Sequence, residues 1–235
     1  MLFDFDGTLA DSAPTVLGAA RAALTEWERP IPPEPQLRRF VGPPIMTGIT
    51  QVLGIEPERA RAFLATYRSH YLTTLTQAEL FDGAVQTLDR LARAGWTLAV
   101  ASSKREDMVV RILEHHALAE RFAVIAGADD AGTRPDKESV IRAALDGLGA
   151  DPRGDCLVMV GDRHHDVDGA AALGIPAVFA AWGYGTPDEA AGAAASAASL
   201  EQLAHLLTDT RPPLPCVGEP VPQTGHDEQQ MGTHS

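Results

Sequence analysis

The chain opens with Met1-Leu2-Phe3-Asp4-Phe5-Asp6-Gly7-Thr8, an apolar start that runs directly into two aspartates and a glycine. This pattern predicts a short strand that ends at a glycine turn. Because successive side chains of a strand point to opposite faces, Asp4 and Asp6 are expected on one side and Phe3 and Phe5 on the other.

Two carboxylates that converge cannot both stay ionised unless a cation lies between them or one of them holds a proton. The pair of Asp4 and Asp6 therefore indicates a metal site, or a couple of acid and nucleophile. Aspartate and glycine are also common in turns, so this stretch alone leaves an ordinary loop open.

The second half of the chain alternates between short apolar runs and helical patterns. Strands are predicted at 97–101, 122–126, 157–160 and 177–181, and helices at 84–94, 106–116, 137–148, 166–173 and 200–207. Buried apolar strands that alternate with helices indicate a parallel sheet covered on both faces. The predicted fold class is α/β, a doubly wound parallel sheet in a Rossmann-like core of three layers.

The segment 14–79 shows no convincing strand. Proline and glycine divide it into four predicted helices, at 15–28, 37–41, 45–53 and 57–75, and Ser12 is expected to cap the first. We therefore predict a core formed by residues 1–13 and 80–208, an all-helical insertion of residues 14–79, and a disordered tail of residues 209–235.

Composition excludes several classes of partner. The 235 residues carry a net charge of −13, which repels phosphate backbones and anionic lipids, so neither a nucleic acid nor a membrane is expected. No signal peptide and no apolar run of membrane-spanning length is recognisable, and a cytoplasmic protein is expected. Only three residues precede Asp4, which predicts a short central strand or a start that lies upstream.

Four motifs that occur in one order favour a functional site at Asp4 and Asp6 over an ordinary loop. They are Asp4–Thr8, Ser102 at the end of an apolar strand, Lys137 at the head of a helix, and Gly161–Asp166 after another apolar strand. With this order the chain resembles the haloacid dehalogenase superfamily, in particular its phosphoglycolate-phosphatase-like branch, and the insertion resembles the helical cap of that family. The resemblance covers all of the chain except the predicted tail.

The resemblance implies a phosphatase mechanism. Asp4 would attack the phosphorus atom and form an aspartyl-phosphate, while Asp6 would serve as general acid and then general base. Members of the superfamily with other activities carry another residue in place of the second aspartate, so Asp6 favours a phosphatase or a phosphomutase.

The resemblance also implies how phosphate and metal would be held. Ser102 and Lys137 would bind the phosphoryl group; many relatives have Lys-Pro at the third motif, so Arg134 is a weaker candidate for the lysine's role. Asp162 and Asp166 would bind Mg²⁺ together with Asp4 and the backbone carbonyl of Asp6, an all-oxygen set of ligands that suits this ion.

Each of these residues also has an ordinary structural interpretation. Ser102 could cap the next helix, Lys137 could be a surface lysine, and Asp166 could be a helix cap. The neighbouring pair His164 and His165 could suggest a transition metal, which we disfavour because no cluster of histidine and cysteine supports it.

These interpretations predict a Mg²⁺-dependent phosphomonoesterase that hydrolyses a small phosphorylated metabolite, similar to phosphoglycolate, through an aspartyl-phosphate. A 5′-nucleotidase, a sugar phosphomutase and a non-catalytic binding protein remain alternatives, and the oligomeric state is not readable from the sequence. A phosphonate hydrolase is disfavoured because residues 14–79 contain no lysine.

Arginines in the predicted cap suggest how an anionic substrate could be selected. Residues 14–78 hold seven arginines against five glutamates and no aspartate, a local charge of about +2 in an acidic chain. Arg38 and Arg39 are the candidates for substrate selectivity, because they precede a proline-rich break at 40–44 where a cap loop could face the core. Solvated surface arginines are the alternative.

Overall fold

A computed structural model describes residues 1–208 and shows six parallel strands in one sheet. The sheet order is β5-β4-β1-β6-β7-β8, so β1 lies at its centre. Leu2 of β1 pairs with Ala99 of β4 and with Met159 of β6. The strands are β1 (Leu2–Phe3), β4 (Ala99–Arg105), β5 (Val124–Ala128), β6 (Met159–Gly161), β7 (Ala177–Ala180) and β8 (Ala195–Ala197). The predicted tail, 209–235, lies outside the described residues.

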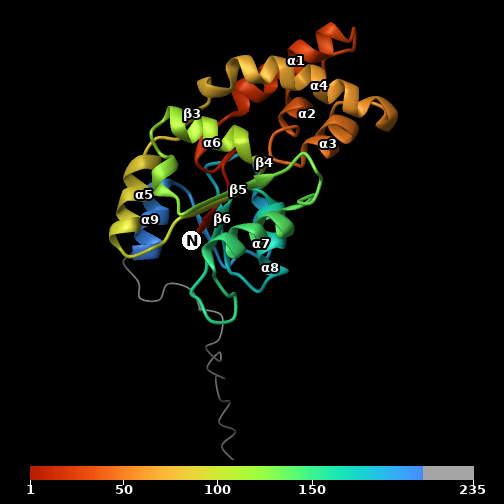
Figure 1. The fold of residues 1–235 in the computed structure, drawn as a ribbon. Helices are drawn as coiled ribbons and strands as arrows, with labels where there is room; N and C mark the ends of the chain where they lie inside the picture. The colour runs from red at the N-terminus through yellow and green to blue at the C-terminus, as the bar shows by residue number, and fades with distance from the viewer. Residues whose placement is uncertain (209–235) are drawn as a thin grey trace, which may run out of the picture.

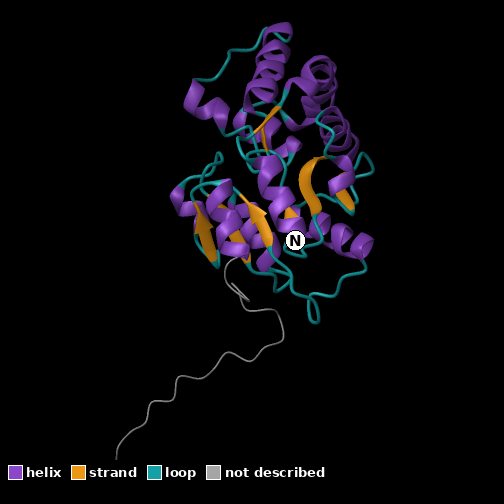
Figure 2. Ribbon diagram, turned by 90° about the vertical axis from the view of Figure 1, so that its left-hand side faces the viewer, coloured by secondary structure: helices purple, strands orange, loops and turns teal. Residues whose placement is uncertain are grey.

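Helices cover both faces of this sheet (Figures 1 and 2). Helices α7 (Lys137–Leu148) and α8 (His164–Ala171) pack on one face. The other face is covered by α5 (Ala84–Arg93), α6 (Glu106–His115) and α9 (Leu200–Thr208). Leu2 belongs to the apolar cluster under α7 and α8, whereas Phe3 belongs to the cluster on the other face, as strand alternation requires. The predicted α/β three-layer core is confirmed.

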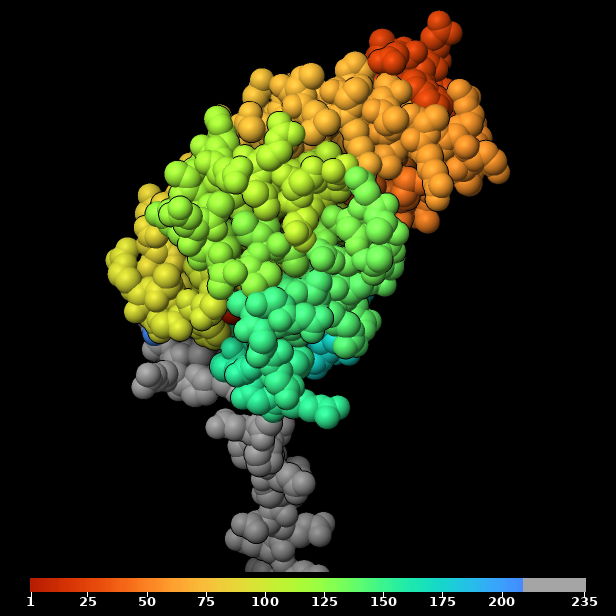
Figure 3. Space-filling model, viewed as in Figure 1, coloured from red at the N-terminus to blue at the C-terminus, as the bar shows by residue number. Residues whose placement is uncertain are grey.

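The inserted segment is helical and extends from one end of the molecule (Figures 1 and 3). Its helices are α1 (Ala13–Glu26), α2 (Glu34–Arg38), α3 (Ile45–Thr47), a π-helical turn η1 (Gly48–Val52) and α4 (Pro57–Thr74). Aromatic side chains join them: Trp27 meets Phe63 edge to face, and Tyr67 does the same with Phe40. The single helix predicted at 45–53 is in fact the short α3 continued by the π-helical turn.

A small antiparallel ribbon lies where the chain leaves the core for these helices and returns. Strand β2 (Ala10–Asp11) pairs with β3 (Glu79–Leu80). The two segments that connect the core with the inserted helices thus lie side by side, close to the boundaries predicted at 13 and 80. A division into core and cap at this ribbon remains our interpretation.

Several local features differ from the sequence predictions. Ser12 occupies the N-cap position of α1 but makes no capping hydrogen bond, because its backbone is already helical (φ −84°, ψ −6°) instead of extended. Strand β8 was not predicted, and neither were the short 3₁₀ turns η2 (Leu75–Gln77), η3 (Ala119–Arg121) and η4 (Pro187–Ala190). Across residues 1–208, no helix is both long and apolar enough to cross a membrane.

Candidate active site

The four predicted motifs meet at the carboxyl edge of the sheet. Asp4 follows β1, Asp162 follows β6 and Ser102 lies in β4, the three neighbouring strands at the centre. Lys137 is the first residue of α7, and Asp166 lies in the first turn of α8. Ligand sites of doubly wound folds lie at this edge, so topology alone brings these side chains together.

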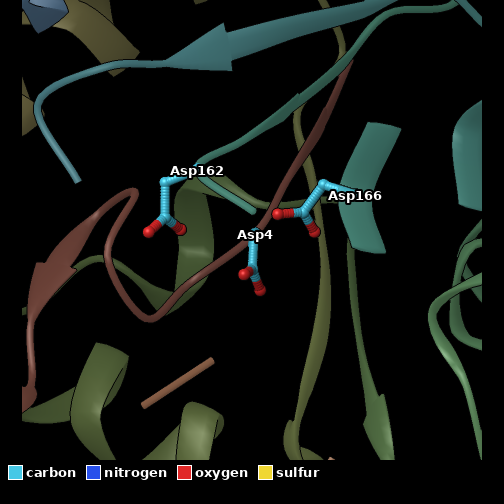
Figure 4. Close-up of side chains that lie close together, drawn as sticks. All are labelled: Asp4, Asp162 and Asp166. Atoms are coloured by element: carbon cyan, nitrogen blue, oxygen red, sulfur yellow. The ribbon is translucent and has the colours of Figure 1, made fainter. Parts of the chain in front are cut away.

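Three of the aspartates form a compact group of buried carboxylates (Figure 4). One oxygen from each of Asp4, Asp162 and Asp166 lies within 4.8 Å of the others. Burial, opposed by Lys137 and reinforced by Asp166, raises the pKa of Asp4 to about 6. Burial, and then the neighbouring carboxylates, also raises the pKa of Asp162 well above its usual value. Carboxylates this close favour a cation among them.

Lys137 supplies one positive charge to this group. Its Nζ lies 2.9 Å from Asp4 Oδ1 and 2.7 Å from Asp166 Oδ1, and donates a hydrogen bond of 3.0 Å to the carbonyl of Ala101. Burial alone would lower the pKa of Lys137, but the two carboxylates outweigh it and the pKa is raised. With three carboxylates and one ammonium, the group has a charge of −2 when fully ionised, and its oxygen ligands suit a divalent hard cation such as Mg²⁺.

The position of Lys137 is fixed by the start of its helix. Asp136 caps α7, accepting from the backbone N–H of Ser139 while the Ser139 hydroxyl hydrogen-bonds the Asp136 backbone, a capping box. Arg134, the weaker candidate, instead hydrogen-bonds Glu106 Oε2 (2.5 Å) and the carbonyl of Gly127 (2.9 Å). Lys137 is therefore buried against the carboxylate group and is not a surface lysine.

Asp162 is oriented by two donors from other parts of the chain. Thr8 Oγ1 donates to Asp162 Oδ1 (3.2 Å), and the backbone N–H of Tyr184 donates to Asp162 Oδ2 (2.7 Å). The sequence did not identify Tyr184 as a partner of Asp162, because the donor is a backbone N–H, which every residue except proline has. The sequence shows only that residues 182–185 directly follow the strand predicted at 177–181.

Glycine backbone packs around Asp162 on that side. Gly7, with φ +81°, adopts a conformation that a residue with a side chain rarely takes. A Cβ atom at Gly7, Gly183 or Gly185 would collide with atoms of Asp162. These three positions form a glycine wall, at which the chain approaches the side chain of Asp162 (Gly7 and Gly183) or its backbone carbonyl (Gly185) more closely than a Cβ atom would allow.

Asp6 has a separate partner. Its Oδ1 and Oδ2 accept hydrogen bonds of 2.8 and 2.7 Å from Lys104 Nζ, which also lies 5.0 Å from the centre of the Tyr71 ring. Asp4 and Asp6, the two carboxylates predicted to converge, each contact a lysine of their own, Lys137 and Lys104 respectively. Only two lysines occur in the chain, Lys104 and Lys137, and both lie in motif regions, which was the one signal available for Lys104.

Ser102 is buried on β4 beside the central strand. Its hydroxyl accepts a long hydrogen bond of 3.3 Å from the backbone N–H of Lys104. The residue before α6 is Arg105, so Ser102 is not the cap of that helix. Ser102 thus lies in the strand next to β1, the strand that Asp4 follows.

A cavity of about 110 Å³ lies between the inserted helices and the core. The inserted segment contributes Phe40, Tyr67 and Tyr71 to its walls, and the core contributes Asp6, Lys104 and Met108. Because Asp6 lies in the wall, a group bound in this cavity would contact the predicted acid and base.

The arginines predicted for substrate selectivity lie elsewhere. Arg38 and Arg39 are exposed, and Arg38 pairs with Glu34 at 3.3 Å. The arginines in the cavity lining are Arg68 and Arg105.

The two histidines of the fourth motif do not join the carboxylate group. His164 Nδ1 lies 2.8 Å from Glu189 Oε2, and Arg163 Nε donates to the same oxygen at 2.8 Å. Although burial opposes it, these contacts lower the pKa of Glu189 to about 2. Arg163 Nη1 also donates to the carbonyl of Val41 (2.5 Å), so the loop that carries Asp162 is tied to the inserted segment.

Residues 1–180 match the haloacid dehalogenase-like hydrolase family. Among solved structures, a predicted phosphatase from Clostridium acetobutylicum superposes with a TM-score of 0.83 at 32% identity, covering 89% of this chain and 97% of that one.

Three characterised relatives carry different activities in their names. The tyrosine-protein kinase PtkA of Mycobacterium tuberculosis is 43% identical over 189 residues, which are 80% of this chain and 64% of the kinase. A 5′-nucleotidase of Pseudomonas aeruginosa is 36% identical over 192 residues (80% and 85%). A phosphoglycolate phosphatase of Xanthomonas campestris is 33% identical over 195 residues (80% and 86%). The matched residues thus span less than two thirds of the kinase.

Proposed function

The chain belongs to the haloacid dehalogenase-like hydrolases, and we propose that it is a Mg²⁺-dependent phosphatase that hydrolyses a small phosphorylated metabolite. The observation that carries the proposal is the buried group of Asp4, Asp162 and Asp166 with Lys137 at its edge, next to a cavity that Asp6 lines. Phosphatase names among the relatives support the same reaction class.

The proposed reaction has two displacements at phosphorus. In the first, a carboxylate oxygen of Asp4 forms a bond to phosphorus while the ester P–O bond breaks, and protonated Asp6 gives its proton to the departing alkoxide. In the second, Asp6 takes a proton from a water molecule whose oxygen attacks the aspartyl-phosphate. The bond between Asp4 and phosphorus then breaks, which releases inorganic phosphate.

The remaining residues would bind the phosphoryl group and the metal ion. Lys137 would contact the phosphoryl oxygens as well as Asp4, and the Ser102 hydroxyl would donate to them. Mg²⁺, held by Asp4, Asp162, Asp166 and the backbone carbonyl of Asp6, would add positive charge beside the phosphoryl group. Lys104 now binds both oxygens of Asp6, so Asp6 can carry the proton of the first step only after Lys104 moves away.

Turnover of p-nitrophenyl phosphate tests the proposal. We expect hydrolysis that requires Mg²⁺ and is suppressed by a chelator or by Ca²⁺, whose looser coordination misplaces the reacting groups. Asp4→Asn should abolish turnover and Asp6→Asn should reduce it roughly a hundredfold or more. Asp168→Asn removes an exposed carboxylate from α8 and is the matched control. Near wild-type rates for either site variant, or full activity in excess chelator, would contradict the mechanism.

The kinase name of a 43% identical relative makes phosphoryl transfer to tyrosine a second candidate. Both activities transfer a phosphoryl group, and they differ in the final acceptor. Incubation with γ-labelled ATP and a tyrosine peptide separates them, because a kinase labels the peptide and a phosphatase releases only inorganic phosphate. Phosphate release from nucleoside monophosphates, compared with phosphoglycolate, tests the 5′-nucleotidase alternative, and interconversion of glucose phosphate isomers tests the phosphomutase alternative.

A further inference from the structure

One arginine joins the loop of the buried carboxylates to the inserted segment. Arg163 directly follows Asp162 and is the N-cap residue of α8. Its Nη1 donates to the backbone carbonyl of Val41 at 2.5 Å, and its Nε donates to Glu189 Oε2 at 2.8 Å. The Arg163 side chain is only 11% exposed, so these bonds are largely shielded from water. We call residues 161–166, which include Asp162 and Asp166, the carboxylate loop.

The segment that Arg163 holds is part of the cavity wall. Four consecutive residues line the cavity, namely Phe40, Val41, Gly42 and Pro43. Gly42 has φ +104°, and a Cβ atom at this position would lie 2.7 Å from Arg163 Nη1 and 3.1 Å from Arg163 Cγ. The backbone of the insert thus lies directly against the arginine side chain, at a distance that only glycine permits. The place of residues 40–43 therefore depends on the place of Arg163.

The backbone of Arg163 is bonded to a carboxylate of the buried group. Its N–H donates to Asp166 Oδ2 at 3.0 Å, while Asp166 Oδ1 lies 2.7 Å from Lys137 Nζ. Contacts therefore run from Asp166 through the backbone and the side chain of Arg163 to Val41 in the cavity wall. A change that fixes or releases the Asp166 carboxylate would reach the insert by this route.

A cation at the buried carboxylates would be such a change. Three carboxylates face one ammonium group there, so Asp4, Asp162 and Asp166 repel one another and the carboxylate loop is pushed outward. A divalent cation removes this repulsion and fixes Asp162 and Asp166 as its ligands. Because ordering one segment lowers the entropic cost of ordering a segment bonded to it, the same cation should also order residues 40–43.

We propose that Arg163 is a positioning residue that couples a cation at the buried carboxylates to the cavity wall, so that a bound divalent cation holds residues 40–43 in place. The inference rests on the proposed function only in taking Asp4, Asp162 and Asp166 as a cation site. Coupling of this kind is reciprocal: a ligand that orders residues 40–43 raises the affinity for the cation by the same factor by which the cation raises the affinity for that ligand.

Hydrogen exchange of the full chain, in Mg²⁺ and in chelator, measures this coupling without turnover. In the unaltered chain we expect Mg²⁺ to slow exchange in the peptides that cover residues 161–168 and 37–48. The second effect should be roughly fivefold, the lower end of the range for coupled sites. Arg163→Met should keep the protection of residues 161–168 and abolish that of residues 37–48. Unchanged exchange in α5 checks that the variant is folded.

Two further variants separate the role of Arg163 from charge and from general contact between insert and core. Arg163→Lys keeps a positive charge beside Glu189, but one nitrogen cannot take the places of both Nε and Nη1, so the protection of residues 37–48 should again be lost. Arg68→Met is the matched control. Arg68 of α4 pairs with Asp130 at 2.9 Å, which also joins the insert to the core, but Asp130 follows β5 and is not part of the carboxylate loop. This variant should keep the full protection by Mg²⁺.

The outcomes separate this inference from the proposed function. Protection of residues 161–168 alone in the unaltered chain overturns the coupling and keeps the cation site. Protection of residues 37–48 that persists in either Arg163 variant, or that is lost equally in Arg68→Met, also overturns the coupling. Exchange that Mg²⁺ changes in neither peptide overturns the cation site and the coupling together. Protection that depends on Arg163, without turnover of p-nitrophenyl phosphate by the unaltered chain, would overturn the phosphatase and keep the coupling.

Discussion

Lys137 is the residue whose charge the buried carboxylates depend on. It contacts Asp4 and Asp166 at 2.9 and 2.7 Å, and its side chain is 3% exposed. Removing one partner of a buried ion pair costs more than the pair contributes, because the remaining charge is left without water or counterion. Lys137 and a bound cation are therefore expected to stabilise the same carboxylates.

Lys137→Met should lower the free energy of unfolding by about 3–5 kcal/mol in chelator, the range for a broken buried pair. Mg²⁺ should restore part of this loss, because a ligand that binds the folded chain stabilises it. Urea unfolding with and without Mg²⁺ measures both effects. Arg142→Met on the same helix is the control: its pair with Glu138 is exposed, and its loss should cost about 1 kcal/mol or less. Equal effects of the two substitutions would contradict this account of Lys137.

At the scale of elements, the loop between β6 and α8 is held from two sides. Glu189 of η4 accepts from Arg163 and contacts His164, while Arg163 reaches the carbonyl of Val41 in the inserted segment. The loop that positions Asp162 and Asp166 thus depends on a carboxylate outside the four motifs.

Glu189→Gln should show a defined dependence on pH. The pKa of Glu189 is about 2 in the folded chain and near 4.5 unfolded, so its contribution to stability is full above about pH 4.5 and is lost as pH falls through 2. The glutamine variant should therefore be less stable than the parent at neutral pH. The difference should shrink between about pH 4.5 and 2, which unfolding curves recorded across that range would show. A difference that does not change with pH would mean that packing, and not charge, is responsible.

The sequence predicted an element correctly where the residue types of a segment reflect its place in the fold, as an apolar run reflects a buried strand. Apolar runs followed by Asp4 or Asp162 marked two strand ends of the candidate site, whereas β4 continues past Ser102 to Arg105. Strand β8 consists of Ala195–Ala197 and gave no signal, because alanine and serine have neither the bulk nor the branching typical of strands. The contact of Asp6 with Lys104 spans 98 residues of sequence, and no local pattern specifies such a pair.

At the scale of the whole molecule, Tyr184 joins the core to the inserted helices. Its hydroxyl donates to Asp11 Oδ1 (2.7 Å) in β2 and accepts from the backbone N–H of Ala13 (3.0 Å), the first residue of α1. The backbone N–H of the same residue binds Asp162. One residue therefore connects the buried carboxylate group with the point where the chain leaves the core.

Tyr184→Phe removes both hydroxyl hydrogen bonds and should lower the free energy of unfolding by about 1–3 kcal/mol. Hydrogen exchange should increase first in α1, because the tyrosine holds its start. Exchange in α7, which Tyr184 does not anchor, serves as the internal control. Uniform acceleration in α1 and α7 would show that the hydroxyl stabilises the whole fold and not this junction.

The glycine wall around Asp162 has a consequence for laboratory evolution of this protein. Backbone forms that side of the site, so substitution at Gly7, Gly183 or Gly185 displaces Asp162, through its side chain or its backbone, and cannot reshape the space available to a new substrate. Side chains of Phe40, Tyr67 and Met108 line the cavity, where a change of size alters the space for a ligand and leaves Asp162 in place. Libraries that seek new specificities should therefore yield active variants from the second set of positions, and inactive ones from the first.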